Sequence, residues 1–156
     1  PQSVMLHRWV PGALRRSGLL IAENHAASHW TNPASAYSAG LRSMLRYGRE
    51  ATTGQLANAQ RCISENRADL VELFAEVDVI LMPTAPQAAF PRDASAPVNQ
   101  ADYTALANAA GCPSISIPCP MLEGGRPVGL QLISGPGNDE NLLACALQLE
   151  QLLASD

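Results

Sequence analysis

Residues 108–134 read NAAGCPSISIPCPMLEGGRPVGLQLIS, and this stretch decides how the rest of the chain is expected to fold. Asn108 to Ala110 completes a helix, because Gly111 can adopt the left-handed backbone conformation that closes a helix and Pro113 prevents its continuation. Alternating apolar segments follow at 114–117 and 128–133, with a glycine-rich reversal at 123–126 between them. The simplest interpretation is a β-hairpin, with Gly129 inside its second strand.

Upstream of this stretch the pattern predicts a long helix and a short strand. Thr52 and Gln55 have the spacing of a capping box, and apolar residues then recur every three or four positions as far as Val77. The wholly apolar segment 79–82 ends at Pro83. A run without polar alternation is typical of a strand covered on both faces in a largely parallel sheet.

The remaining segments are assigned from breakers and caps. Residues 84–98 are rich in proline and predict an irregular loop, and a short helix is expected at 102–108. Asn138 is expected to cap a final helix whose first turn holds Asp139 and Glu140. Nearer the start, short helices are predicted at 23–30 and 37–47, the second ended by Gly48.

This order of elements predicts an α/β layer structure. We expect a single domain over 1–156, with at least three strands flanked by helices. Residues 1–22, which contain a break at Pro11–Gly12, form a leading segment without assigned structure.

Bulk composition excludes several classes of function. The chain has 156 residues, a net charge of −4 and a hydrophobic fraction of 47%, which argues against a nucleic-acid or anionic membrane surface. No apolar run approaches the ~20 residues that span a bilayer. We therefore expect a globular protein without nucleic-acid or membrane partners, and the cysteine pattern described next indicates the reducing cytoplasm.

Metal and cofactor sites are not predicted. The four cysteines (Cys62, Cys112, Cys119 and Cys145) include no Cys-x-x-Cys pair, so buried, reduced thiols are the better interpretation. His25 and His29 are spaced for one helical face, but the intervening glutamate of zinc peptidases is absent. A packing role is the favoured interpretation for both histidines.

Candidates for nucleophilic catalysis are also lacking. No G-x-S-x-G motif is present, and Ser114 and Ser116 lie in an apolar segment with no histidine or lysine nearby in sequence. Hydrogen bonding to the backbone or lining a pocket is the favoured role of both serines. All ten basic Lys+Arg residues are arginines, so no lysine base can come from this chain.

Four blocks together resemble a known family. These are DVILMPTAP at 78–86, NAAGCPSISIP at 108–118, RPVGLQLI at 126–133, and the acidic pair at 139–140 before a leucine-rich helix. In order and spacing they resemble the carboxy-terminal part of the amidase signature family. The resemblance implies an α/β/α structure around a large mixed sheet, and amide hydrolysis by two serines and a lysine. No position here matches those three residues, so no catalytic residue is assigned to this chain.

The resemblance does imply candidate pocket residues. In similar proteins the turn at 108–113 packs near the catalytic layer, and the segment after it lines the acyl pocket. Thr84, Ser114 and Ile115 are therefore candidate wall residues of a substrate pocket. Asn108, Gly111, Pro113 and Gly129 are the expected structural motif; support of the sheet alone is the alternative role for the wall residues.

The expected function is that of a part of a larger enzyme. The sequence begins at Pro1, and we expect it to be a piece of a longer amidase whose amino-terminal portion holds the catalytic residues. The alternatives are a non-catalytic assembly or binding module and, within the family, the A-type subunit of a transfer-RNA-dependent amidotransferase. A free-standing small-molecule amidase is favoured, because 48–54 lacks the tyrosines usual in that A-type chain and Asp102 does not align with its acidic residue. The expected partners are a small-molecule amide and either the amino-terminal portion or a second copy, which would cover the strand edges.

Overall fold

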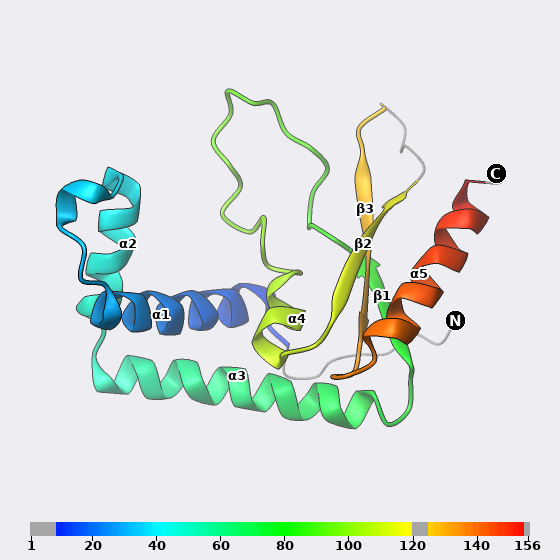
Figure 1. The fold of residues 1–156 in the computed structure, drawn as a ribbon, viewed down its shortest axis with the longest axis horizontal. Coiled ribbons are helices and arrows are strands. Elements are labelled where there is room, and N and C mark those ends of the chain that lie inside the picture. Colours follow the sequence, from blue (N-terminus) through cyan, green and yellow to red (C-terminus); the bar gives the residue numbers. More distant parts are fainter. Residues whose placement is uncertain (1–8, 120–124, 155–156) are drawn as a thin grey trace.

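The computed structural model describes residues 9–119 and 125–154, which form helices and a three-stranded sheet. Figure 1 shows α1 and α2 at one end of the molecule, the sheet and α5 at the other, and α3 running between the two ends. The predicted α/β class is confirmed. In chain order the elements are α1 (Pro11–His29), η1 (Ala34–Ala36), α2 (Ala39–Arg49), α3 (Thr53–Leu73), β1 (Val79–Pro83), α4 (Ala105–Ala110), β2 (Ser114–Cys119), β3 (Val128–Ser134) and α5 (Asp139–Leu153).

β3 is the central strand of the sheet, whose order is β1-β3-β2. It pairs antiparallel with β2, and Cys119 lies opposite Val128, so the predicted hairpin is confirmed. The middle of its reversal, at Glu123 and Gly124, lies outside the described residues. β2 continues through Pro118, where it was predicted to end. An edge strand tolerates proline because the missing N–H removes no bond on the solvent side.

The prediction of a parallel neighbour for β1 is wrong. β1 pairs antiparallel with β3, with Val79 opposite Ser134. Its uniformly apolar sequence reflects packing on both faces: Val79 contacts one hydrophobic cluster, and Ile80 and Met82 contact another. Contacts on both faces therefore account for Val79, Ile80 and Met82, whereas Leu81 is 53% exposed and is not explained by them.

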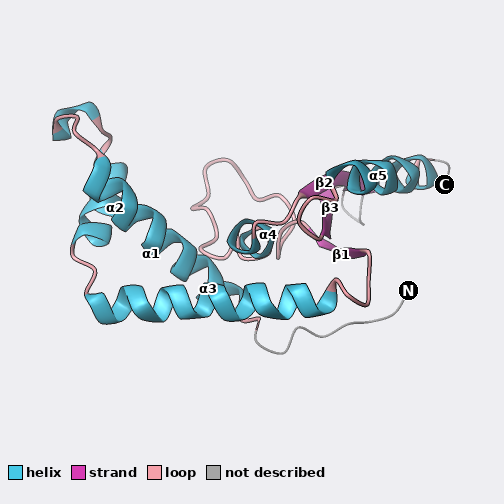
Figure 2. Ribbon diagram, turned by 60° about the horizontal axis from the view of Figure 1, so that its bottom comes forward, coloured by secondary structure: helices cyan, strands magenta, loops and turns pink. Residues whose placement is uncertain are grey.

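Two hydrophobic clusters lie on opposite faces of the sheet. Ile133 of β3 joins the first cluster, which includes Leu14 of α1, Leu70 of α3 and Leu106 of α4. The adjacent Leu132 joins the second cluster, with Ile117 of β2 and with Leu142 and Ala146 of α5. Since neighbouring side chains of a strand point to opposite faces, one strand serves both clusters. The turned view in Figure 2 shows the sheet between α5 and the α3–α4 layer.

α1 is one continuous helix, which corrects the predicted break at Pro11–Gly12 and the separate helix at 23–30. Pro11 occupies the first helical turn, where its missing N–H has no partner in any case. The same residue that suggested an interruption therefore begins the helix.

The ends of α3 and α5 depend on different capping arrangements. The predicted capping box of α3 is confirmed: Gln55 N–H donates to Thr52 Oγ1 over 3.2 Å, and Thr52 N–H donates to Gln55 Oε1 over 2.8 Å. Asn138 precedes α5 as predicted, but its side chain makes no capping bond. The acidic residues Asp139 and Glu140 instead complement the positive end of that helix.

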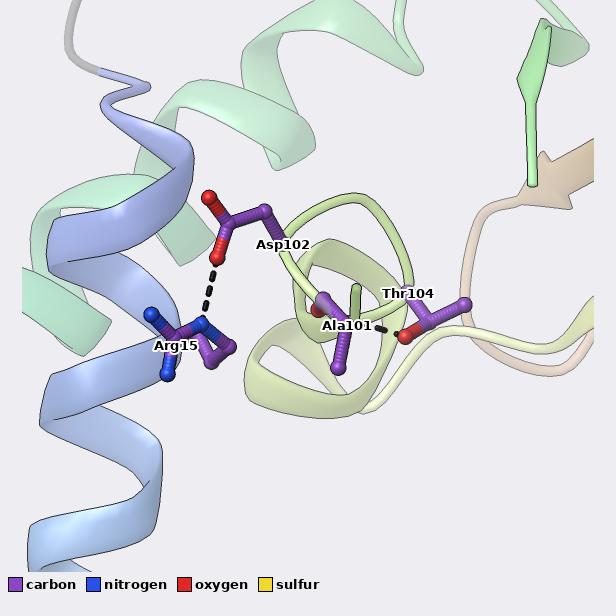
Figure 3. A network of polar contacts seen from close by, with 4 residues as sticks. All are labelled: Arg15, Ala101, Asp102 and Thr104. Atoms are coloured by element: carbon purple, nitrogen blue, oxygen red, sulfur yellow. Dashed lines mark hydrogen bonds and ion pairs between the residues drawn. The ribbon is translucent and has the colours of Figure 1, made fainter. Parts of the chain in front are cut away.

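An ion pair joins α1 to the turn before α4 (Figure 3). Arg15 Nε donates to Asp102 Oδ1, and Asp102 is buried. In the same turn, Thr104 Oγ1 donates to the Ala101 carbonyl over 3.3 Å. A buried carboxylate needs a partner, so this contact fixes where α4 sits against α1.

Gly48 lies inside α2, which corrects the prediction that it ends the helix. It packs directly against the backbone of α1: a Cβ atom at this position would lie 2.3 Å from the backbone carbonyl carbon of Glu23. Asn24 Nδ2 donates to the Gly48 carbonyl over 2.9 Å at the same crossing. In the described part of the chain, every helix is too short or too polar to cross a membrane.

We predict that Gly48→Ala lowers the free energy of unfolding by about 2–4 kcal/mol, because the new methyl group would overlap backbone that cannot move aside cheaply. Urea denaturation measures this change. Gly40→Ala is the matched control in the same helix, since no atom lies within 4 Å of its added Cβ. The control should be neutral or stabilising by up to about 1 kcal/mol; equal losses in the two variants would contradict the steric explanation.

Candidate functional site

A pair of hydroxyl groups meets across the central strand. Thr84 follows β1 and Ser116 lies in β2, and their Oγ1 and Oγ atoms are 2.6 Å apart. Thr84 N–H donates to the Gly129 carbonyl over 2.9 Å, which extends the pairing of β1 with β3 by one residue. A Cβ atom on Gly129 would lie 2.6 Å from Ser116 Oγ and 2.7 Å from Thr84 Oγ1. The two outer strands can share this hydrogen bond because the central residue has no side chain.

The hydroxyl pair lines a cavity of about 270 Å³. One wall is the loop from Thr84 to Phe90, and the other comes from Ser116 and the start of β3 at Val128 and Gly129. Arg126 Nη1 donates to the Ala89 carbonyl over 3.5 Å, which ties this loop to the beginning of β3.

Gln87 also lines the cavity, and its side-chain oxygen is unpaired. Its Oε1 atom is buried and has no hydrogen-bond partner among the described residues. Buried carbonyl oxygens are normally bonded, so a ligand that brings an N–H or O–H donor would satisfy this atom. The wall of the cavity therefore carries hydroxyl groups that either donate or accept, with the unpaired Gln87 oxygen buried in the same wall.

The side chains that line the cavity are suited to binding a ligand. Within the described residues, no ionisable side chain lines the cavity. A hydroxyl without an adjacent base is a weak nucleophile. The arrangement is thus suited to holding a small neutral polar group, and any proton transfer needs residues from outside this lining.

The three predicted wall residues occupy different positions. Thr84 lines the cavity, whereas Ser114 is exposed and does not contribute to the lining. Ile115 packs against the cluster beneath α5, on the other face of the sheet. Ser116, for which backbone bonding or pocket lining was expected, lines the cavity, and Gln87 lines it although the sequence did not single it out. The alternation of β2 places Ser114 and Ser116 on one face, but only the register with β3 shows which of them reaches Thr84.

The predicted structural motif connects α4 to the sheet. Asn108 lies exposed in α4, and Gly111 closes this helix with a φ of 70°, in the left-handed region expected for it. The Pro113 carbonyl accepts from Ser134 N–H over 3.2 Å, so the start of β2 is joined to the end of β3.

His25, His29 and the four cysteines lie in the part of the chain that the structure describes. In the described part of the chain, no three His, Cys, Asp or Glu side chains gather as a metal site would require. The rings of His25 and His29 stack with centroids 4.1 Å apart, and the His29 ring bonds to the His25 carbonyl over 2.8 Å. Burial raises the pKa of the Cys112 thiol, and the positive charge of Arg67 opposes this shift.

Comparison with known proteins gives a consistent set of similarities. A sequence model of the amidase family, described as "Amidase", matches residues 26–143. The chain is 45% identical over 92 residues to the A subunit of glutamyl-tRNA(Gln) amidotransferase from Thermus thermophilus, covering 56% of this chain and 19% of that protein. It is 35% identical over 140 residues to the corresponding protein from a Synechococcus species, covering 83% of this chain and 28% of that protein.

The fold has a counterpart among solved structures. A crystal structure of an amidase superposes with a TM-score of 0.76 over 90% of this chain and 35% of that one, at 23% identity. The chain thus spans less than a third of the length of the two curated relatives.

We predict that Gly129→Ala lowers the free energy of unfolding by about 1–3 kcal/mol, because its methyl group would separate the two hydroxyls or displace β3. Chemical denaturation measures the loss. Adding Ser116→Ala removes the nearer of the two clashing oxygens and should recover part of it. If the loss in the double variant equalled the sum of the losses in the two single variants, the clash would not be the cause.

We also predict that Cys112 reacts slowly with disulfide reagents at neutral pH. A raised pKa leaves less thiolate at a given pH, and thiolate is the reactive form. Labelling followed by mass spectrometry should show the exposed Cys145 modified first, and the Cys112 rate should still be rising above pH 9, the ordinary pKa of a cysteine thiol. Cys112→Ser is the control and should leave the fast phase unchanged. Labelling of Cys112 in the fast phase at neutral pH would contradict the prediction.

Proposed function

The chain belongs to the amidase family, and on that basis we propose that it is the carboxy-terminal scaffold and pocket portion of an enzyme that hydrolyses a carboxamide C–N bond to an acid and ammonia or an amine. Catalysis is assigned to the complete protein. The chain supplies no lysine, so the lysine base of the resembled family has to come from another part of that protein.

The observation that carries this proposal is the neutral cavity beside Gly129. Its hydroxyl pair and the unpaired Gln87 carbonyl match the groups of a carboxamide, which has both N–H donors and a carbonyl acceptor. An uncharged lining is suited to an uncharged amide, because a buried charge would have no counter-charge there.

Exposed apolar surface supports a further covering element. Leu143, Leu147 and Leu152 of α5 are each more than half exposed, although the other side of this helix packs on the sheet. Among the described strands, β1 and β2 are both edges. Exposed leucines and open edges favour association, and we assign the covering role to the amino-terminal catalytic portion or to a second copy.

A second candidate is the A-type subunit of a glutamyl-tRNA(Gln) amidotransferase. What favours it is that the two curated relatives described above bear this name and are 45% and 35% identical to the chain over the 92 and 140 residues that align. Such a protein would release ammonia from an amide donor and work with further subunits. A non-catalytic module that keeps the scaffold is the third alternative.

One assay separates these candidates. The full-length protein is incubated with simple carboxamides and with glutamine, and ammonia release is measured with and without glutamyl-tRNA(Gln) and the companion subunits. Turnover of simple amides by the protein alone supports the amidase. Turnover of glutamine that depends on the companion subunits supports the amidotransferase. No ammonia under any condition supports the non-catalytic module and overturns the proposal.

We predict that Ser116→Ala in the full-length protein raises KM for the amide about three- to tenfold and changes kcat less, because it removes a binding hydroxyl from the cavity wall. Steady-state ammonia release measures both constants. Ser114→Ala is the matched control, since Ser114 lies in the same strand but does not line the cavity. The KM of the control should stay within about twofold of that of the unmodified protein. An equal rise in KM in both variants would show that the cavity does not bind the amide.

A further inference from the structure

A second cavity lies where α1 turns into α2. It has a volume of about 580 Å³ and shares no lining residue with the cavity beside Gly129. Figure 1 shows the α1–α2 pair at the end of the molecule away from the sheet. Its volume is in the range of small-molecule sites.

The side chains of this cavity are basic and aromatic. Arg42, Arg46 and Arg49 of α2 all line it, at the spacing that places residues on one face of a helix. The lining includes no aspartate or glutamate, so its three arginines are its only charged side chains. Glu23 and Glu50, which flank residues 24–49 in the chain, are not among the lining residues.

Two of the three guanidinium groups keep their donors available. Arg42 Nη1 donates to the Tyr37 carbonyl, whereas Arg46 and Arg49 have no side-chain hydrogen bond or ion pair among the described residues. Guanidinium groups bind carboxylate and phosphate oxygens through pairs of parallel hydrogen bonds. The cavity can therefore offer two such groups to one anion.

An aromatic pair forms another part of the wall. The rings of Trp30 and Tyr37 stack with centroids 4.8 Å apart and an interplanar angle of 10°, and Trp30 is 45% exposed. The hydroxyl of Tyr37 is buried without a partner among the described residues, so it has an unused donor. A flat apolar group can stack on exposed aromatic surface of this kind.

The wall is held in place before any ligand binds. Gly48 brings α2 into backbone contact with α1, and Asn24 bonds to the Gly48 carbonyl at the same crossing. Ser38 Oγ caps the start of α2 by accepting from Leu41 N–H over 3.2 Å. A preformed site spends less binding free energy on ordering.

From these observations we propose that the α1–α2 cavity is a binding site for a small anion that joins a phosphate or carboxylate group to a flat aromatic ring. The guanidinium groups of Arg46 and Arg49 bind the anionic group, and Trp30 contacts the ring. The site is separate from the proposed amide cavity, so it would serve a second ligand.

Calorimetric titration of the full-length protein tests this site, with phenyl phosphate and benzoate as probes and inorganic phosphate and benzyl alcohol as partial probes. We expect saturable binding of phenyl phosphate or benzoate, and comparison of the two identifies the preferred anionic group. Inorganic phosphate should bind about tenfold more weakly than phenyl phosphate, and benzyl alcohol should not bind measurably.

Amino-acid substitutions test whether the measured heat of binding comes from this cavity. Arg46→Gln with Arg49→Gln should weaken binding about tenfold or more, whereas Arg61→Gln, on the exposed face of α3, should stay within about twofold. Trp30→Leu should weaken the binding of phenyl phosphate but leave the affinity for inorganic phosphate unchanged. Ser116→Ala should change the affinity for neither probe. Failure of this proposal can therefore be distinguished from failure of the proposed amide cavity. No saturable binding of either ring-bearing anion, equal loss in Arg61→Gln, or full affinity without Arg46 and Arg49 would overturn the assignment.

Discussion

The alternation of side chains along β3 is the constraint on which the rest of the structure depends. Leu132 points into the cluster beneath α5, and Ile133 points into the cluster formed with α1, α3 and α4. A shift of one residue in register would exchange these faces, so each side chain would enter a cluster packed around the other. Because β1 and β2 each pair with β3, the same register also aligns the two outer strands with one another.

The cavity beside Gly129 is a direct product of that alignment. Thr84 and Ser116 come from opposite edges of the sheet and would be kept apart by any side chain on the central strand. Glycine at this one position allows their hydroxyls to meet at 2.6 Å. The Arg15–Asp102 ion pair acts farther away, since it holds α4, and thereby the start of β2, against α1. Packing, pairing and one buried charge together place a polar cavity in an otherwise apolar layer.

Local signals in the sequence predicted most elements, while contacts between distant segments escaped prediction. The capping box at Thr52, the helix end at Gly111 and the β2–β3 hairpin depend on residues close together in the chain. Pro11 and Gly48 were misread because their local meaning is ambiguous: proline begins as well as breaks helices, and glycine permits close packing as well as termination. Thr84 was proposed as a wall residue through family resemblance, and that role stays a prediction. Which of Ser114 and Ser116 lies beside Thr84 could not be predicted, since it depends on a register that involves three separated strands.

The strand order also has a consequence for the order in which the strands pair during folding. Cys119 and Val128 are joined by a short connection, so the entropy lost in closing the β2–β3 loop is small. The partner of Val79 in β1 is Ser134, with the long loop, α4 and all of β2 between them in the chain. Contacts of such high sequence separation form late and slow folding. The hairpin can therefore set its register first. The hydroxyl pair needs the end of β1, so it is completed only when that distant strand docks. Substitutions in β2 and β3 should slow folding more than substitutions in β1, and the φ-value at Leu132 should exceed that at Val79.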